Sequence, residues 1–151
     1  MRLVLQRVSE AEVTVEGEVV ATIGPGLLVL AGVAPTDQSI DARAAAEKLA
    51  VIRLFADDDG HMNRSIVDTG GEILVVSQFT LLADVRRGRR PSFTGAATPE
   101  LAAPLIEALA EHLIEIGIPT QTGRFGARMG VSLVNDGPVT VVLEFSEGRL
   151  I

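Results

Sequence analysis

The chain has 151 residues, of which 47% are hydrophobic and 22% charged, and its formal net charge is −7. This length allows one well-buried domain, and we expect residues 1–151 to form a single domain. The absence of cysteine excludes disulfides, thiol nucleophiles and cysteine-ligated metal sites. The negative charge argues against a general binder of nucleic-acid phosphates. We see neither a signal peptide nor an apolar run that could span a membrane, so we expect a cytoplasmic protein.

Short β-branched segments predict strands in the first part of the chain, over residues 3–8, 12–15, 19–23 and 27–33. The capping residues Thr36, Asp37 and Ser39 then predict the start of a helix. Alanine and leucine at helical spacing continue this helix to about Ile52. The acidic run 57–60 is typical of a solvated turn, because its spacing does not match a calcium loop.

The second half predicts a buried strand over 73–79 and a helix that begins near Thr98-Pro99-Glu100. Pro104 falls inside that helix, where a proline costs about 3 kcal/mol, so the helix either kinks there or begins near it. Further strands are predicted over 131–134 and 139–145. About seven strands clustered toward the two ends of the chain, with two main helices, predict an α+β fold with a mixed sheet.

The segment Ser77-Gln78-Phe79-Thr80 lies at the end of the predicted buried strand and carries two side-chain hydroxyls and one side-chain amide. One interpretation is a strand end whose polar side chains satisfy nearby backbone groups. The other is a reactive site in which Thr80 or Ser77 is the nucleophile. Such a nucleophile needs a base, and no His, Lys or carboxylate lies within three residues. Either a distant residue supplies the base, or the nucleophile belongs to the substrate.

The segment 135–140 reads Asn-Asp-Gly-Pro-Val-Thr between two predicted strands. A plain Asp-Gly hairpin is disfavoured, because Pro138 has no N–H to close it. We therefore expect a special turn, for which a cis Gly137-Pro138 bond is one option. Such a turn would point the carbonyls of Gly137 and Pro138 outward, where they suit a ligand ammonium group.

Four arginines gather in one short window of this acidic chain: Arg86, Arg87, Arg89 and Arg90. They form either a solvated loop or a phosphate-binding patch, and the guanidinium fork suits phosphate oxyanions. No pattern in the sequence points to a bound metal or an organic cofactor, and we expect none.

Six blocks, taken in order and at these spacings, resemble the D-aminoacyl-tRNA deacylases of the bacterial and eukaryotic type over essentially the whole chain. The blocks cover residues 1–8, 62–65, 77–81, 88–93, 122–125 and 135–140. The resemblance implies a small barrel-like α+β domain that works as a homodimer with active sites at the subunit interface. It also implies aminoacylated tRNA as the partner, with neither DNA nor a membrane involved.

The resemblance further implies roles for the two central motifs. The residues Ser77, Gln78, Phe79 and Thr80 line the site, and Gly137-Pro138 is a Gly-cisPro motif that reaches into the partner subunit's site. Its carbonyls hold the α-amino group of a D-aminoacyl ester and exclude an L side chain. The implied reaction is hydrolysis of D-aminoacyl-tRNA, and of glycine mischarged on the alanine tRNA.

The resemblance also implies that Phe125 and Met129 line the pocket for the terminal adenosine and that Arg7 braces the Gly-cisPro turn. Either Thr80 attacks the ester or the 2′-hydroxyl of the terminal adenosine assists. We favour the second mechanism, because Thr80 has no local base. Backbone N–H groups around residues 78–80 would then hold the oxyanion. Arg128 and Leu82 depart from residues common in the family, and we assign Arg128 no role.

Two other functions remain open at this point. The first is a hydrolase that acts on small D-aminoacyl substrates through a covalent intermediate on Thr80 or Ser77. The second is a dimer without catalytic activity that binds RNA ends or DNA through the arginine cluster, with strong salt dependence.

Overall fold

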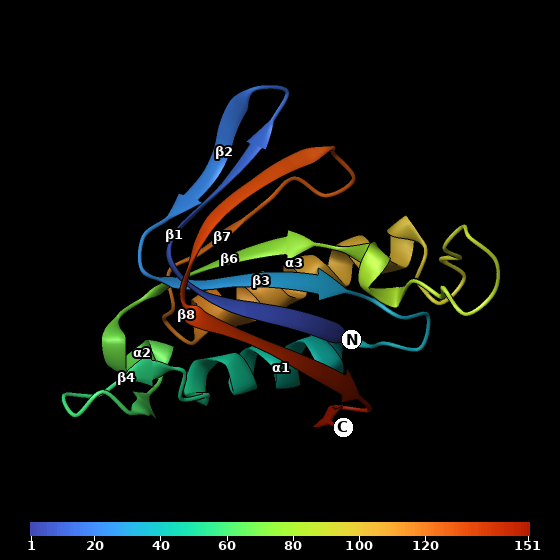
Figure 1. Cartoon of the computed structure of the whole chain (residues 1–151). Coiled ribbons are helices and arrows are strands. Elements are labelled where there is room, and N and C mark those ends of the chain that lie inside the picture. The colour runs from blue at the N-terminus through green and yellow to red at the C-terminus, as the bar shows by residue number, and fades with distance from the viewer.

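One curled, mixed sheet organises the computed structural model, which describes residues 1–151 (Figure 1). Its strands follow the order β7-β6-β3-β1-β8-β9, and β2 pairs with β1 as the seventh strand. β3, β6 and β7 run parallel, whereas β1 is antiparallel to β2, β3 and β8. The predicted α+β fold, with a barrel-like mixed sheet of seven strands and two main helices, is confirmed.

The elements, in chain order, are β1 (Arg2–Val15), β2 (Glu18–Ile23), β3 (Gly26–Gly32), α1 (Ser39–Val51), β4 (Phe55–Ala56), β5 (Met62–Arg64), α2 (Ile66–Thr69), β6 (Glu72–Ser77), a 3-10 turn (Phe79–Leu82), α3 (Pro99–Glu115), β7 (Thr120–Thr122), β8 (Met129–Ser146) and β9 (Arg149–Leu150). β4 and β5 form a separate two-stranded sheet. None of the helices combines the length and the apolar composition needed to cross a membrane.

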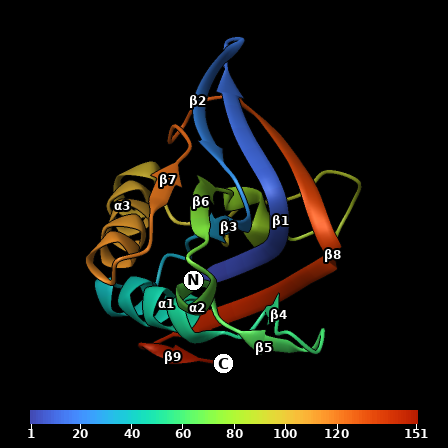
Figure 2. The same cartoon turned by 90° about the vertical axis from the view of Figure 1, so that its left-hand side faces the viewer.

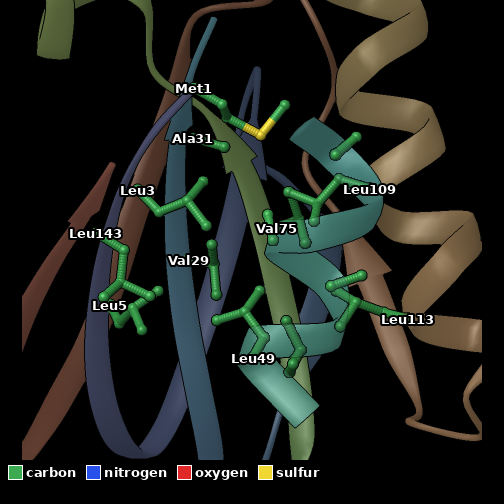
Figure 3. Close-up of a cluster of buried hydrophobic side chains, with 14 of the residues drawn as sticks. Met1, Leu3, Leu5, Val29, Ala31, Leu49, Val75, Leu109, Leu113 and Leu143 are labelled. Carbon is green, nitrogen blue, oxygen red and sulfur yellow. The ribbon is translucent and has the colours of Figure 1, made fainter. Parts of the chain in front are cut away.

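The helices α1 and α3 pack together on one face of the sheet (Figure 2). Alternate residues of the central strands point at these helices, as the period of two in a β-strand requires. Leu3, Val29 and Val75 come from three neighbouring strands and meet Leu49 of α1 and Leu109 of α3 (Figure 3). Burial of a side chain of this size stabilises the fold by about 1.5–3 kcal/mol. This core holds the ends of β3 and β6 in a fixed position.

A second, smaller core lies on the other face, under the β1–β2 arm. It contains Val13, Ile23, Leu28 and Leu74, and partly buried residues of β8 pack against it. The sheet therefore buries apolar side chains on both faces where it curls.

Three predicted boundaries were wrong. β1 is one strand rather than two, because β8 pairs with it up to Val8 and again from Glu10 onward. The strand predicted over 73–79 ends at Ser77, where the chain enters the 3-10 turn. The last two predicted strands belong to one long strand, β8, which is bent between them.

The helix with an internal proline begins at Pro99, and Pro104 lies in its second turn. The alternative start near Pro104 is therefore wrong. A proline this close to the start removes one helical hydrogen bond, which the packing of α3 on the core offsets. The short strand β7 was not predicted, because Thr120–Thr122 has too few residues to show a pattern.

Candidate functional site

A cavity of about 340 Å³ lies where β3 and β6 end, beside the first turns of α3. Ser77, Gln78, Phe79, Phe93 and Phe125 are among the residues that line it. The remaining lining residues are Ala31, Val33, Ala96, Ala97, Pro99, Ala102, Ile106 and Gly126, so no side chain in the wall is ionisable. The cavity therefore offers shape, apolar contact and hydrogen bonds, but no acid or base.

The 3-10 turn Phe79–Leu82 presents main-chain donors beside this cavity. The Gln78 N–H continues the sheet and donates to the Ala31 carbonyl at 2.7 Å, and the first bond within the turn runs from the Leu81 N–H to the Gln78 carbonyl at 3.2 Å. The N–H groups of Phe79 and Thr80 come before the first donor of the turn and have no partner inside it. The backbone N–H groups of residues 78–80 were expected to face an oxyanion. The N–H of Gln78 cannot do so, because it already donates to the Ala31 carbonyl.

The Thr80 hydroxyl accepts a hydrogen bond from the side-chain amide of Gln78. No histidine, lysine or carboxylate contacts this hydroxyl in the structure. Thr80 is therefore placed as a polar neighbour of the cavity without the base that a nucleophilic hydroxyl requires.

Phe93 was not assigned a role from the sequence, although it lies in one of the blocks that carry the resemblance. Its ring meets that of Phe79 edge to face, with centroids 5.0 Å apart and an interplanar angle of 70°. Phe79, Phe93 and Phe125 are all at least 36% exposed at this cavity, in a protein with five phenylalanines and no tryptophan or tyrosine. Aromatic residues are scarce in this chain, and three of them lie in separate sequence motifs. This pattern could have identified Phe93 as a residue of the site.

The arginine cluster occupies the loop that leads to Phe93. Asp84 and Ser92 close this loop through two backbone hydrogen bonds of 2.7 and 2.9 Å. Arg86 forms two side-chain hydrogen bonds to Asp84, at 2.9 and 2.7 Å. They lower the pKa of the Asp84 carboxyl and raise the pKa of Arg86. The loop is thus held by Arg86, whereas its other three arginines are exposed and have no partner in the protein.

The bend in β8 contains the Gly137-Pro138 motif. Gln6 pairs with Thr140 and Val8 with Asn135, so the four residues 136–139 lie opposite a single residue, Arg7. The Gly137-Pro138 bond is cis, as the resemblance implied. The Asn135 side chain accepts the Val139 N–H at 2.7 Å, so the turn closes without a donor from Pro138. The prediction of a special turn instead of a plain hairpin is confirmed.

Arg7 connects this bend to the rest of the molecule through side-chain hydrogen bonds. Its Nε donates to the Asp136 carbonyl at 2.8 Å, and its Nη1 donates to the Leu54 carbonyl at 2.6 Å. The Arg7 side chain is only 14% exposed. These contacts hold the backbone beside Gly137 against the sheet.

A family model described as D-Tyr-tRNA(Tyr) deacylase matches residues 4–144 of the chain. The chain belongs to this deacylase family. A D-aminoacyl-tRNA deacylase of Roseiflexus castenholzii is 61% identical over 144 residues, which cover 95% of this chain and 92% of that one. One of Chloroflexus aurantiacus is 59% identical over 150 residues, covering 99% and 94%. The family expected from the sequence is confirmed.

Two solved structures resemble the deacylase. The c-Myc DNA Unwinding Element Binding Protein has a TM-score of 0.91 and 40% identity, and the match covers 97% of this chain and 99% of that one. A structure titled as a probable eukaryotic D-amino acid tRNA deacylase has a TM-score of 0.81 over 93% of this chain and 97% of that one. At 19% identity, the second likeness shows a shared fold alone.

Within one chain of the deacylase, the two motifs lie apart. Arg7, opposite the Gly137 bend, pairs with Leu27 at the start of β3, whereas Ser77 pairs with Ala31 at its end. Four residues of strand separate these levels by about 13 Å, before the width of the intervening strands is counted. In Figure 1 the bend of β8 lies at the left, whereas the arrowhead of β6 points to the right, so the two features lie toward opposite ends of the strands.

Two further features of the deacylase bear on the predicted residues. Met129 packs against Gly123 and the second core and does not line the cavity with Phe125. The acidic run 57–60 forms the predicted turn, in which Asp57 accepts the His61 N–H at 2.9 Å and the Asp59 N–H at 3.0 Å. These hydrogen bonds, led by that of His61, lower the pKa of Asp57.

Proposed function

We propose that this protein hydrolyses the ester bond of D-aminoacyl-tRNA, releasing the D-amino acid and tRNA, and that it rejects L-aminoacyl esters. Residues 1–151 act as one domain, on charged tRNA in the cytoplasm. The observation that carries the mechanism is a cavity with no ionisable side chain beside the free N–H groups of Phe79 and Thr80. Such a site positions its substrate and stabilises developing charge, but it does not transfer protons itself.

In this mechanism, the missing proton-transfer group comes from the substrate. The 2′-hydroxyl of the terminal adenosine assists the attack of water on the ester carbonyl, and the negative charge develops on the carbonyl oxygen. The N–H groups of Phe79 and Thr80 donate to that oxygen. The bond between the carbonyl carbon and the ribose 3′-oxygen then breaks, and the proton lost by the water passes through the 2′-hydroxyl to the leaving 3′-oxygen. Phe125 contacts the adenosine, with Met129 as part of the packing behind this segment. Thr80 contributes its amide rather than its hydroxyl.

The second part of the proposal is a homodimer in which each subunit completes the other's site. The separation of the two motifs within one chain supports it, because a D-aminoacyl group at Phe79 cannot also reach the same chain's Gly137. In the dimer, the carbonyls of Gly137 and Pro138 enter the partner subunit's cavity and accept the ammonium group. Arg7 keeps this turn in place. An L side chain meets the turn, whereas glycine on the alanine tRNA does not.

The test measures release of labelled tyrosine from D-tyrosyl-tRNA and L-tyrosyl-tRNA, with wild-type protein and Thr80→Ala at catalytic concentration. We expect multiple turnovers with the D-ester alone. Thr80→Ala should keep its rate within about tenfold of wild type, because the lost hydroxyl takes no part in bond making. An acyl-enzyme trapped on Thr80 or Ser77 would instead establish the covalent mechanism. Binding of tRNA or DNA without turnover would contradict the whole proposal.

We further propose that Arg87, Arg89 and Arg90 contact tRNA phosphates, and that Arg86 contributes mainly by holding the loop. The double variant Arg87→Ala/Arg90→Ala should raise KM about tenfold without changing kcat, and reduce the slope of log KM against log salt concentration by about 1.5. The double variant Arg43→Ala/Arg149→Ala removes two exposed arginines outside the loop and provides the charge-matched control. Equal KM values for the two double variants across a salt series would show that the loop is not part of the tRNA interface.

A further inference from the structure

The backbone carbonyl of Leu81, within the 3-10 turn, accepts a hydrogen bond from the beginning of the chain. Arg2 Nη1 lies 2.7 Å from the Leu81 oxygen, and Arg2 Nε pairs with the carboxylate of Glu144 on β8. The last carbonyls of a helical segment have no partner within it, so an external donor satisfies one of them. A guanidinium donor makes a stronger hydrogen bond than a neutral group does.

Gly32, at the end of β3, lets the same turn lie directly on the sheet. A Cβ at this position would clash with the Leu82 side chain and would lie 2.9 Å from the Gln78 carbonyl oxygen. Gly32 is also the residue of β3 that pairs with Arg2. The turn therefore packs directly against Gly32 and is held in place by the hydrogen bond from Arg2.

We propose that Arg2 is a positioning residue of the deacylase site. By holding the Leu81 carbonyl, it fixes the orientation of the turn and hence of the Phe79 and Thr80 N–H groups. Arg2 does not line the cavity, so its effect passes through the backbone of the turn. This inference rests on the proposed function in one respect, which is the catalytic role given to the N–H groups of Phe79 and Thr80.

The geometry of the contact argues for this role over a purely structural one. The Arg2 side chain is 38% exposed, so truncating it opens no cavity in the core. What is lost is the exposed ion pair with Glu144 and one oriented hydrogen bond to a four-residue turn, and only the second of these contacts reaches the site. Because donors in such sites must lie close to the position of the developing charge, a small rotation of the turn is enough to slow the reaction.

The first arm of the test does not depend on activity. Backbone amide NMR spectra are recorded for wild type, Arg2→Ala, Arg2→Lys and the control Arg43→Ala, which removes an exposed arginine that pairs with Glu47 on α1. We expect Arg2→Ala to shift or broaden the amide signals of residues 79–83, and Arg2→Lys, which keeps a cationic donor, to move them back toward wild type. Unchanged signals at 79–83 in Arg2→Ala would overturn the proposal.

The second arm measures kcat and KM on D-tyrosyl-tRNA for the same four proteins. Arg2→Ala should lower kcat about tenfold with KM within about twofold, and Arg2→Lys should recover most of the lost rate. Arg43→Ala should match wild type. A wild-type kcat in Arg2→Ala would overturn the positioning role. A wild-type protein that releases no tyrosine would refute the proposed function, and the NMR arm would still decide whether Arg2 holds the turn.

Discussion

Replacing Gly137 with alanine is expected to lower kcat/KM for D-tyrosyl-tRNA by at least about 100-fold and to erode the preference for the D-ester. Gly137 has a φ of +144°, which L side chains rarely adopt. An added Cβ would lie 2.8 Å from Val139 Cγ2, 2.9 Å from Val139 N and 3.1 Å from Arg7 Nη2. The bend must rotate to relieve these contacts, so its carbonyls no longer meet the ammonium group at the required angle.

Single-turnover release from both tyrosyl esters measures this effect, and circular dichroism verifies that the variant is folded. Gly60→Ala is the matched control, because Gly60 also has a positive φ, +82°, but an added Cβ there meets no atom within 4 Å. Gly60→Ala introduces the same kind of backbone strain from a positive φ, about 1–3 kcal/mol, but it does not alter the bend in β8. A folded Gly137→Ala protein with wild-type selectivity would show that the bend plays no part in discrimination.

Replacing Gly32 with alanine is the second change with a large expected effect. The new Cβ would press on Leu82 and on the Gln78 carbonyl, and backbone cannot give way as a flexible side chain can. We expect the free energy of unfolding to fall by about 1–3 kcal/mol, as for other overpacked positions, and kcat to fall by at least about 100-fold. Urea denaturation and D-tyrosyl-tRNA turnover measure the two losses separately.

Gly24→Ala supplies the comparison for Gly32. A Cβ at Gly24 meets only the Glu72 carboxylate, at an ordinary contact distance of 3.5 Å. This variant should keep wild-type turnover and nearly the wild-type denaturation midpoint. If Gly32→Ala behaved in the same way, close packing of the 3-10 turn against Gly32 would not be required for activity. The argument that the orientation of the turn is fixed would then fail.

Local runs of apolar and β-branched residues predicted both the buried strand β3 and the more exposed strand β2. The strand predicted over 27–33 is β3, Gly26–Gly32, and the one predicted over 19–23 is β2, Glu18–Ile23. The continuity of β8 was not predictable, because the apolar alternation stops at the bend. What joins its two halves is their pairing with β1, more than a hundred residues away in sequence.

The motifs of the site were visible in the sequence, but their arrangement was not. Hydrogen bonding decided that the Gln78 amide belongs to the sheet, and packing decided that Met129 belongs to a core. The contact between Arg2 and Leu81 has no local signal at all, since it depends on how β1 and the end of β6 meet in space.

A cavity without ionisable side chains has a consequence for how this protein tolerates change. Its polar contacts to substrate would come mainly from peptide groups, which every amino acid carries. An alanine scan of the cavity wall would therefore leave the main-chain donors in place, and its losses would come from apolar contacts such as that of Phe125 with the adenosine. The vulnerable positions are those that shape the main chain, such as Gly32, Asn135 and Gly137. Under the proposed mechanism, catalysis would depend on the conformation of the main chain rather than on the functional groups of side chains.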